Sequence, residues 1–417
     1  MLARPIFKIA KRVSSGLTPL RSNPRFWQNG TIPWLKTEQL GEKYIYDTTE
    51  TISEVAQRET GIKVCPKNTL SIAMYGEGRT RGNISIIKAE MATNQACCNV
   101  ELDPKQADYE YVYYFLKTQY EGLRTLSSGV RKNLNSNDIK NFVIRLPKEV
   151  SVQQKIAAVL SSLDAKIECN NRINAELETM AKTQYDYWFV QFDFPNAKGK
   201  PYKSSRGKMA YNQKLKREIP DGWTDGTLND LGKIVGGSTP STQEKENFTT
   251  DGTPWITPYD LSNNQGKKFI TRGAQDVSDT GIKSASLKKY PSGTVLLSSR
   301  APIGYLAIAR NELTTNQGFK SFIPNNGYST GFIYYTVKRS MKAIIQYASG
   351  STFQEISASV LKTVKIVLPE SDIVEQFTKA VNPILQRQNL LEQENQELTQ
   401  LRDWLLPMLM NGQVTVA

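Results

Sequence analysis

The chain has 417 residues, of which 39% are hydrophobic and 22% are charged, and its formal net charge is +13. This composition is typical of a folded protein with two or three domains, and no apolar run approaches the roughly 20 residues of a membrane-spanning helix. The absence of histidine excludes catalytic groups and metal sites built on that residue. The four cysteines lack CxxC or zinc-finger spacing, so we expect reduced thiols in a cytoplasmic protein.

Much of the positive charge lies in one segment. Residues 196–217 contain eight lysines and arginines and no acid, so they supply +8 of the +13. Their Gly, Pro and Ser content predicts a solvated linker. The remaining +5 is modest, so the charge favours an anionic partner such as nucleic acid without establishing one.

Residues 151–192 predict a long helix. The segment contains no proline or glycine, and apolar residues recur every three or four positions from Ile156 to Trp188. Asn170 and Asn174 fall on the same stripe. Such a heptad seam predicts packing against a partner helix, and about 40 residues would span roughly 60 Å.

The sequence contains an internal duplication. Thr18 and Trp34 of the first copy reappear as Thr239 and Trp255, at an offset of 221 residues. Both copies also share a Gly-x-Thr-Pro turn, a Pro-Trp pair, a Thr-Asn-Gln segment (93–95 and 315–317) and a Leu-Pro pair (146–147 and 368–369). A near-constant offset over more than a hundred residues indicates that each copy is a whole domain.

The repeat includes a second long helix over residues 371–406, in which we expect Pro383 to kink or interrupt the first turns. The order domain, helix, domain, helix predicts that the two helices pair within the chain. A two-fold relation between the halves would make the helices antiparallel and place the globular domains at opposite ends. Pairing between two chains through the same seams is the alternative.

Each globular part is predicted to be mixed α/β. Short apolar runs bounded by Gly, Pro and Asn predict strands, for example at 69–74, 84–87, 294–298 and 306–309, and residues 109–118 and 331–342 predict helices. We therefore expect a mixed α/β, internally duplicated fold, with two globular domains separated by two long antiparallel coiled-coil helices. The expected boundaries are 1–150 for the first domain, 151–195 for the first helix, 196–218 for the basic linker, 219–370 for the second domain and 371–417 for the second helix with its tail.

No catalytic signature is present. The sequence has no G-x-x-x-x-G-K-[ST] phosphate loop, no dinucleotide-binding glycine spacing and no Glu-x-Lys nuclease motif. We therefore expect no catalytic residue, no resident cofactor and no metal in this chain.

The loops of each repeat carry side chains suited to DNA. Arginine can bind guanine, Asn and Gln can bind adenine, and Ser, Thr and Lys can hold phosphates. In the first repeat the candidates are Lys36, Thr37, Tyr75, Arg79, Arg81, Asn83, Ser128, Arg131, Lys132 and Asn133. In the second repeat they are Thr257, Tyr259, Ser299, Arg300, Tyr305, Ser349, Ser351, Thr352 and Gln354. The alternative is that these are ordinary polar surface loops.

These features resemble the specificity subunit of type I restriction–modification systems. The resemblance covers essentially the whole chain and rests on the repeated Gly-x-Thr-Pro and Pro-Trp segments, the Thr-Asn-Gln segments, the Ser-Gly-Ser-Thr loop at 349–352 and the helix end at 394–412. It implies that each globular part is a target recognition domain that reads one half of a bipartite site in double-stranded DNA. The helices would set the spacer between the half-sites and dock two methyltransferase (modification) subunits.

The resemblance also implies that restriction/translocase subunits join the complex. The partner subunits would bind S-adenosylmethionine and ATP with Mg. This chain would be a non-catalytic subunit that does not bind a membrane. We expect a cytoplasmic, nucleoid-associated protein of a bacterium or archaeon.

The two repeats differ at their start. The second opens at 219–223, and Trp223 would fall at Leu2 of the first. We expect either a trimmed start or a C-terminal segment, residues 411–417, that takes this role. Two other functions compete with a DNA-reading subunit. The first is a coiled-coil scaffold or adaptor with two non-DNA ligand modules, and the second is a stand-alone enzyme. Matched loops with different sequences favour reading two different half-sites.

Overall fold

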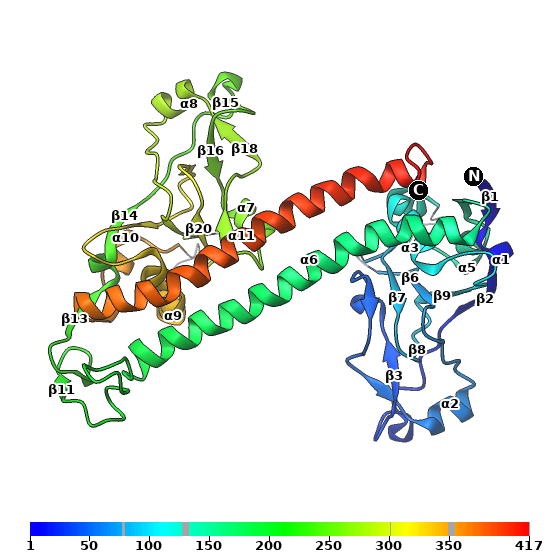
Figure 1. The fold of residues 1–417 in the computed structure, drawn as a ribbon, viewed down its shortest axis with the longest axis horizontal. Helices are drawn as coiled ribbons and strands as arrows, with labels where there is room; N and C mark the ends of the chain where they lie inside the picture. The colour runs from blue at the N-terminus through cyan, green and yellow to red at the C-terminus, as the bar shows by residue number, and fades with distance from the viewer. Residues whose placement is uncertain (77–79, 127–132, 301, 349–354, 417) are drawn as a thin grey trace. The chain divides into compact units, whose positions relative to one another are not determined.

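The computed structural model describes residues 1–76, 80–126, 133–300, 302–348 and 355–416. The chain divides into two compact units, which we call the first unit (Met1–Glu168 with Glu397–Ala417) and the second unit (Cys169–Gln396). Each contains one globular part and portions of both long helices, labelled α6 and α11 in Figure 1. No helix among the described residues is long and apolar enough to cross a membrane.

The first unit is built on a five-stranded sheet with a smaller sheet beside it. The large sheet has the order β2 (Ala10–Ser15), β9 (Cys97–Leu102), β6 (Leu70–Ala73), β7 (Ile84–Ile87) and β4 (Tyr44–Ile45). The small sheet has the order β5 (Thr51–Ile52), β3 (Ile32–Leu35) and β8 (Ala92–Thr93). The helices are α1 (Ile6–Ile9), α2 (Glu54–Thr60), α3 (Tyr109–Thr118), α4 (Tyr120–Thr125) and α5 (Ser136–Asn141). Short 3-10 turns cover η1 (Pro24–Phe26) and η2 (Thr37–Gln39).

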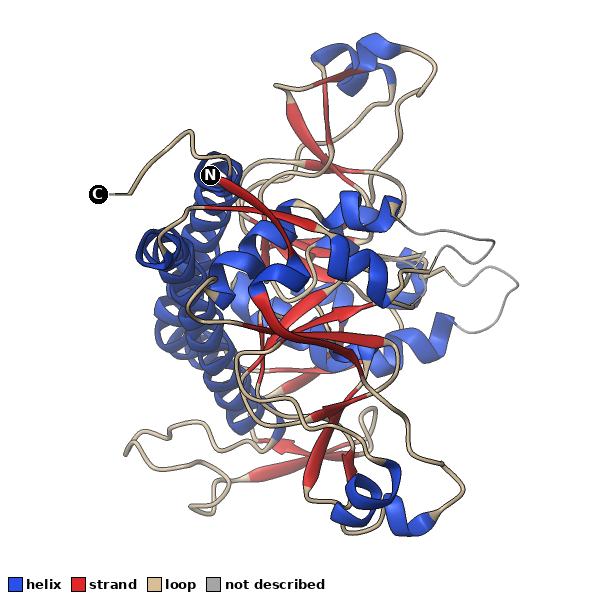
Figure 2. Cartoon of the chain, turned by 90° about the vertical axis from the view of Figure 1, so that its right-hand side faces the viewer, coloured by secondary structure: helices blue, strands red, loops and turns tan. Residues whose placement is uncertain are grey.

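The second unit repeats this topology. Its five-stranded sheet has the order β14 (Gly232–Val235), β22 (Ser321–Pro324), β19 (Val295–Leu297), β20 (Leu306–Ala309) and β17 (Phe269–Ile270). Its smaller sheet has the order β15 (Phe248–Thr249), β18 (Gln275–Val277), β16 (Thr253–Ile256) and β21 (Thr314–Thr315). The helices are α7 (Pro258–Asn263), α8 (Asp279–Ser284), α9 (Thr330–Ala348) and α10 (Ala358–Leu361), and 3-10 turns cover η4 (Leu228–Leu231) and η5 (Lys245–Asn247). Figure 2 shows the strands and helices of both units.

The pairing of equivalent strands confirms the duplication. Strands β4 and β7 are parallel, as are β17 and β20, and the parallel pair β3–β8 corresponds to β16–β21. The strands and helices predicted in each globular part are present, and α9 is longer than expected. The mixed α/β prediction is therefore confirmed.

The repeated glycine motif is explained by close packing. A Cβ atom added to Gly16 would lie 2.2 Å from the Thr93 carbonyl oxygen, and one added to Gly237 would lie 1.9 Å from that of Thr315. These distances are too short for any side chain, so only glycine allows the Gly-x-Thr-Pro turn to pack against the Thr-Asn-Gln segment. Thr18 then donates to Gln95 in the first unit.

The repeated tryptophan fixes the same turn. Trp34 Nε1 donates to the Leu17 carbonyl oxygen (3.0 Å), and Trp255 Nε1 donates to that of Ser238 (3.1 Å). Both indoles are almost fully buried, so a satisfied N–H is required there. The conserved spacing between the turn and the Pro-Trp pair therefore has a structural origin in both repeats.

The start of the first repeat differs from expectation. Strand β1 (Leu2–Pro5) pairs with β10 (Val143–Leu146), just as β13 (Thr224–Thr227) pairs with β23 (Lys365–Leu368). The first repeat thus has the matching opening strand, although no tryptophan precedes it. Val416 of the C-terminal tail packs against the core of the first unit.

The basic segment is folded, contrary to the prediction of a solvated linker. Strands β11 (Met209–Asn212) and β12 (Arg217–Pro220) form a hairpin. The Tyr202 ring stacks on Phe194, with ring centroids 4.6 Å apart, and Phe194 also stacks on Trp223. The aromatic residues within and beside the segment hold it against the rest of the second unit, which its charge did not reveal.

Two long helices are present as predicted. Helix α6 runs over Val150–Tyr185 and continues into a π-helical turn, η3 (Asp186–Val190), whereas α11 runs over Ser371–Met410. The sequence predicts that Pro383 kinks or interrupts the first turns of the second helix, and the interruption is wrong, because α11 is continuous through this residue. Pro383 lies on the exposed side of α11, and buried Val381 and Leu385 on either side hold the helix in place despite the missing N–H.

Each unit contains contacts between the two helices. In the first unit Arg402 of α11 donates to Asp164 of α6 (2.9 Å). In the second unit Asn170 of α6 donates to Asn395 Oδ1 of α11 (2.9 Å), and Asn170 is fully buried. Of the two polar residues expected in the seam, Asn170 is thus paired with a polar residue of the other helix.

Candidate nucleic-acid interface

In the first unit, three loops with predicted DNA-binding residues lie together. The candidates within the described part of these loops are Lys36, Thr37, Tyr75, Arg81, Asn83 and Asn133. The side-chain amide of Asn83 donates to the Leu40 carbonyl oxygen (3.0 Å), which joins the loop before β7 to the loop after β3. The Leu134 N–H donates to the Met74 carbonyl oxygen (3.1 Å), which brings the segment before α5 to the same place.

The local contacts show which of these candidate side chains are accessible and which already have partners within the protein. Tyr75 is 40% exposed, so its ring is accessible. Lys36 is paired with Glu38 and Glu50 (2.6 Å each), and the hydrogen bonds to Glu38 and then Glu50 raise its pKa. Contact with a phosphate would therefore require Lys36 to exchange an existing partner. The Asn83 amide is committed to the loop junction and has a structural role.

In the second unit the equivalent loops meet in the same way. The described candidates are Thr257, Tyr259, Ser299, Arg300 and Tyr305. The Ser299 N–H donates to the Gly318 carbonyl oxygen (2.8 Å), and a Cβ added to Gly318 would lie 2.9 Å from Pro258 at the start of α7. The Ile356 N–H donates to the Ser299 carbonyl oxygen (2.9 Å), which adds the third loop. Both repeats thus gather three loops through different hydrogen bonds.

The described candidates of the second unit differ in exposure. Ser299 has no exposed surface, and its hydroxyl has no hydrogen-bond partner among the described residues, so the DNA contact predicted there stays a prediction. The Thr257 hydroxyl donates to Asp260 (2.7 Å) in the capping box of α7. Tyr259, by contrast, is 68% exposed, and the ion pair of Arg300 among the described residues is a long 3.8 Å contact with Glu355. Tyr259 and Arg300 are therefore the more accessible groups.

Tyr305 lines a groove that the sequence did not predict. The groove has a volume of about 650 Å³ and is also lined by Lys267 and Lys338. The adjacent lysines Lys267 and Lys268 could have indicated this groove in the sequence, but only Lys267 is exposed.

In the first unit, the sequence analysis also missed Tyr120 and Arg124 of α4. They lie beside Gly82, next to Arg81, because a Cβ added there would be 3.3 Å from each side chain.

The remaining candidates lie outside the described residues. They are Arg79, Ser128, Arg131, Lys132, Ser349, Ser351, Thr352 and Gln354.

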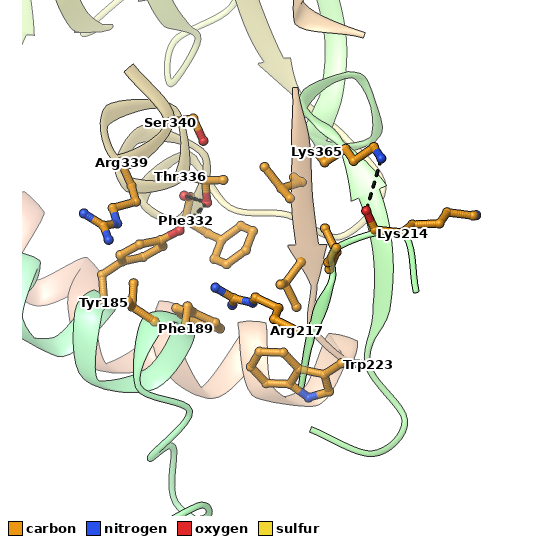
Figure 3. A pocket seen from close by; sticks show the side chains of 14 residues that line it. Tyr185, Phe189, Lys214, Arg217, Trp223, Phe332, Thr336, Arg339, Ser340 and Lys365 are labelled. Atoms are coloured by element: carbon orange, nitrogen blue, oxygen red, sulfur yellow. Dashed lines mark hydrogen bonds between the residues drawn. The ribbon is translucent and has the colours of Figure 1, made fainter. Parts of the chain in front are cut away.

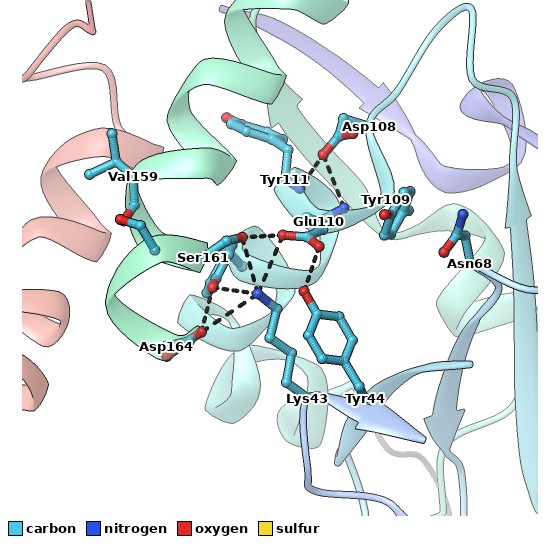
Figure 4. A network of polar contacts seen from close by, with 12 residues as sticks. Lys43, Tyr44, Asn68, Asp108, Tyr109, Glu110, Tyr111, Val159, Ser161 and Asp164 are labelled. Atoms are coloured by element: carbon cyan, nitrogen blue, oxygen red, sulfur yellow. Dashed lines mark hydrogen bonds and ion pairs between the residues drawn. The ribbon is translucent and has the colours of Figure 1, made fainter. Parts of the chain in front are cut away.

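A buried lysine anchors the first globular part to the helices (Figure 4). Lys43 Nζ donates to Tyr114 (2.8 Å) of α3 and to Ser161 (3.1 Å) of α6, and pairs with Glu110 (3.3 Å). Burial lowers the pKa of Lys43, while the charges of Glu110 and Asp164 oppose this. Because burial disfavours the charged amine, these partners are needed to hold it in place.

The second unit has a corresponding anchor. Lys268 Nζ pairs with Glu178 (2.5 Å) of α6 and donates to Tyr335 (2.7 Å) of α9 and to Gln388 (2.6 Å) of α11. Burial lowers the pKa of Lys268. Burial also opposes ionisation of Glu178, but the charge and hydrogen bond of Lys268 outweigh it and lower the pKa of Glu178. The loops with the predicted DNA-binding residues thus belong, in each unit, to a globular part that is joined to α6 by a lysine.

Three of the four cysteines are buried in the described structure, whereas Cys169 is partly exposed. Burial raises the pKa of Cys65, Cys97 and Cys98 to about 12, so these thiols remain protonated at neutral pH. Within the described ranges, no three Cys, Asp or Glu side chains come together as metal ligands. The arrangement presents polar and basic loops, which suits binding.

Comparison with known proteins gives consistent matches. Relatives include the MjaIX specificity subunit of Methanocaldococcus jannaschii, which is 45% identical over 157 residues, covering 37% of this chain and 36% of the relative. The HindI specificity subunit of Haemophilus influenzae is 29% identical over 336 residues, covering 69% of this chain and 72% of the relative. Both are described as subunits of type I restriction enzymes.

The fold is also similar to that of a solved structure. The type I restriction–modification S subunit from M. genitalium matches with a TM-score of 0.65 at 17% identity, covering 98% of this chain and 95% of the other. The family model described as the type I restriction modification DNA specificity domain matches residues 6–179 and 220–400. Because the two matches fall on the two repeats and cover most of the sequence, the chain belongs to the type I restriction–modification DNA specificity family.

Proposed function

We propose that this chain selects the DNA sequence for a type I restriction–modification complex. Each globular domain would read one half of a bipartite site in double-stranded DNA. The observation that carries this proposal is the duplicated three-loop arrangement, in which the scaffold is repeated and the exposed side chains differ. At matched positions of the loop that follows β3 or β16, the exposed residue is Glu38 in the first copy and Tyr259 in the second. A repeated scaffold with different side chains suits two different half-sites.

The two long helices would form an antiparallel pair that sets the spacer between the half-sites. The lengths of α6 and α11, 36 and 40 residues, correspond to about 54 and 60 Å. Contacts between the C-terminal part of α11 and the N-terminal part of α6 in the first unit, and between their opposite ends in the second, support this pairing.

The helix pair would also dock two methyltransferase subunits, and restriction/translocase subunits would join through the complex. S-adenosylmethionine, ATP and Mg would be bound by those partners, and this chain would supply no catalytic residue. Family membership and the absence of catalytic motifs from the sequence support this division of labour.

The test is co-expression of the chain with its neighbouring methyltransferase subunit, followed by mapping of methylated adenines across a genome. We expect one bipartite sequence to be methylated only when both proteins are present. Methylation by the methyltransferase subunit alone at the same sequence would contradict the proposal. A matched complex with Tyr259→Ala and Arg300→Ala should lose methylation while keeping its subunits.

A further inference from the structure

The second unit contains a pocket with an aromatic floor and a basic rim (Figure 3). It has a volume of about 340 Å³ and lies between the end of α6, the hairpin β11–β12, helix α9 and strand β23. Tyr185, Phe189 and Phe332 contribute to the buried floor. The basic residues among those that line it are Lys214, Arg217, Arg339 and Lys365, and none of its lining residues is acidic.

Among the described residues, only Lys214 of these four cations has an anionic partner. Lys214 pairs with Asp225 (3.0 Å), and Lys365 donates to the Lys214 carbonyl oxygen (3.1 Å). Throughout the described parts of the chain, the guanidinium groups of Arg217 and Arg339 form neither a hydrogen bond nor an ion pair. Arg217 lies only over the ring of Phe192, at 4.9 Å.

The two arginines also repel each other. Burial lowers the pKa of Arg217, and the positive charge of Arg339 lowers it further. In Figure 3, Arg217 enters the pocket from β12 and Arg339 from α9. An anion between them would remove this repulsion and satisfy several donors at once.

The first repeat provides an internal control for α9 and β23, because it contains the equivalents of these two elements without their cations, whereas its described residues include no counterpart of the hairpin β11–β12. Phe332 corresponds to Tyr111, so an aromatic residue is kept in the equivalent helix. Arg339 corresponds to Thr118, and Lys365 of β23 corresponds to Val143 of β10. The fold therefore does not require positive charge at these positions.

We propose that this pocket binds a phosphate group between Arg217 and Arg339, with the apolar part of the ligand against the aromatic floor. Two guanidinium forks and the Ser340 hydroxyl offer more donors than the two oxygens of a carboxylate accept, whereas phosphate has more oxygens and more charge. The volume lies at the lower end of the range of small-ligand pockets. The phosphate comes either from a free nucleotide or from the DNA backbone. The inference does not depend on how the recognition loops read bases.

The test uses the full chain in complex with its methyltransferase subunit and compares three forms: wild type, the double variant Arg217→Ala with Arg339→Ala, and the control Lys203→Ala. Lys203 is an exposed lysine of the same basic segment that does not line the pocket. A second double variant, Arg217→Lys with Arg339→Lys, keeps the positive charges but lacks the forked guanidinium groups. Thermal melting followed by circular dichroism identifies any variant that fails to fold. If the alanine double variant fails to fold, the lysine double variant replaces it in the binding measurements.

Two measurements distinguish the sources of phosphate. Calorimetric titration with ATP, AMP and inorganic pyrophosphate tests whether the pocket binds free phosphate compounds. We expect the variants at Arg217 and Arg339 to bind at least tenfold more weakly than the wild type. The Lys203→Ala control should bind as tightly as the wild type. The salt dependence of binding to a nonspecific duplex tests the backbone, and we expect its log–log slope to fall by about 1–2 in the alanine variant. A loss confined to one measurement identifies the source. If neither differs from the Lys203→Ala control, the proposal is overturned.

Discussion

Two buried lysines couple the domains of this protein to its helices. Lys43 and Lys268 each hold a tyrosine of the helix that follows the sheet, Tyr114 and Tyr335 respectively. Each also reaches a polar side chain of α6. Because a buried cation without its partners costs several kcal/mol, these networks restrict the domain to one position on the helix.

Replacing Glu178 by glutamine tests this coupling. The substitution leaves Lys268 buried without its anion, so we expect the unfolding free energy of the second unit to fall by about 3–5 kcal/mol at pH 7. Chemical denaturation monitored by tryptophan fluorescence measures this. The control is Glu375→Gln, which removes an exposed partner of Lys379 and should have little effect.

The same substitution predicts a pH dependence. The pKa of Glu178 is lowered from 4.5 in the folded protein, so its contribution is fully present above pH 4.5 and is lost as the pH falls through the lowered value. The difference between the wild type and Glu178→Gln should therefore shrink below pH 4.5. A difference that stays constant down to pH 3 would contradict this assignment.

Close packing at the repeated glycines gives a second prediction. Gly16→Ala places a Cβ 2.2 Å from a backbone oxygen, so we expect a loss of at least about 1–3 kcal/mol in the stability of the first unit. Gly122→Ala is the control, because its Cβ would meet only Gln119, at 3.7 Å, within helix α4. That change should be neutral or stabilising by about 0.5–1 kcal/mol. Equal effects of the two substitutions in thermal melts would refute the packing account.

At the scale of elements, the long helices tolerate local defects because their packing compensates. Helix α11 continues through Pro383 and also contains Pro407. In α6 the buried Asn170 finds its partner in Asn395, and Asn395 donates to Asn171 (2.7 Å). A polar pair at a buried seam fixes the register of helices at some cost in stability.

Pro383→Ala should stabilise α11. The substitution restores a backbone N–H in an exposed position, and the gain should reach at most about 3 kcal/mol. The melting temperature of the second unit is expected to rise. Pro258→Ala is the contrasting variant, because Pro258 is buried in the first turn of α7, where proline is favourable, so no gain in stability is expected there. A lower melting temperature for Pro383→Ala would show that the proline has a role in the helix.

The proposed spacer function belongs to the helix pair as an element. Deleting one matched heptad from α6 and α11, away from the contacts of Lys43 and Lys268, shortens each helix by about 10 Å. We expect the methylated sequence to have a spacer shorter by about three base pairs, since each base pair occupies 3.4 Å. Mapping of methylated adenines would reveal this, and an unchanged spacer would exclude the helices as the determinant of distance.

At the scale of the whole molecule, regular features were predictable and tertiary pairings were not. Heptad periodicity located both helices, and a constant offset revealed the duplication, because these signals repeat many times. The burial of Ser299 depends on backbone bonds to Gly318 and Ile356, which local sequence does not encode. The fold of the basic segment likewise depends on stacking of Tyr202 on Phe194. Of the candidate site, the sequence identified the loops, whereas their junctions and the buried lysines required the structure.

The central claim is that each globular domain reads one half-site independently, and an exchange of domains tests it most directly. Residues 1–150 are replaced by the equivalent domain of another specificity subunit, and the hybrid is expressed with its methyltransferase subunit. Sequencing that detects methylated adenine then gives the recognised sequence. The account predicts that one half of the site changes while the other half and the spacer length stay the same. An unchanged sequence, or a change in both halves, would contradict it.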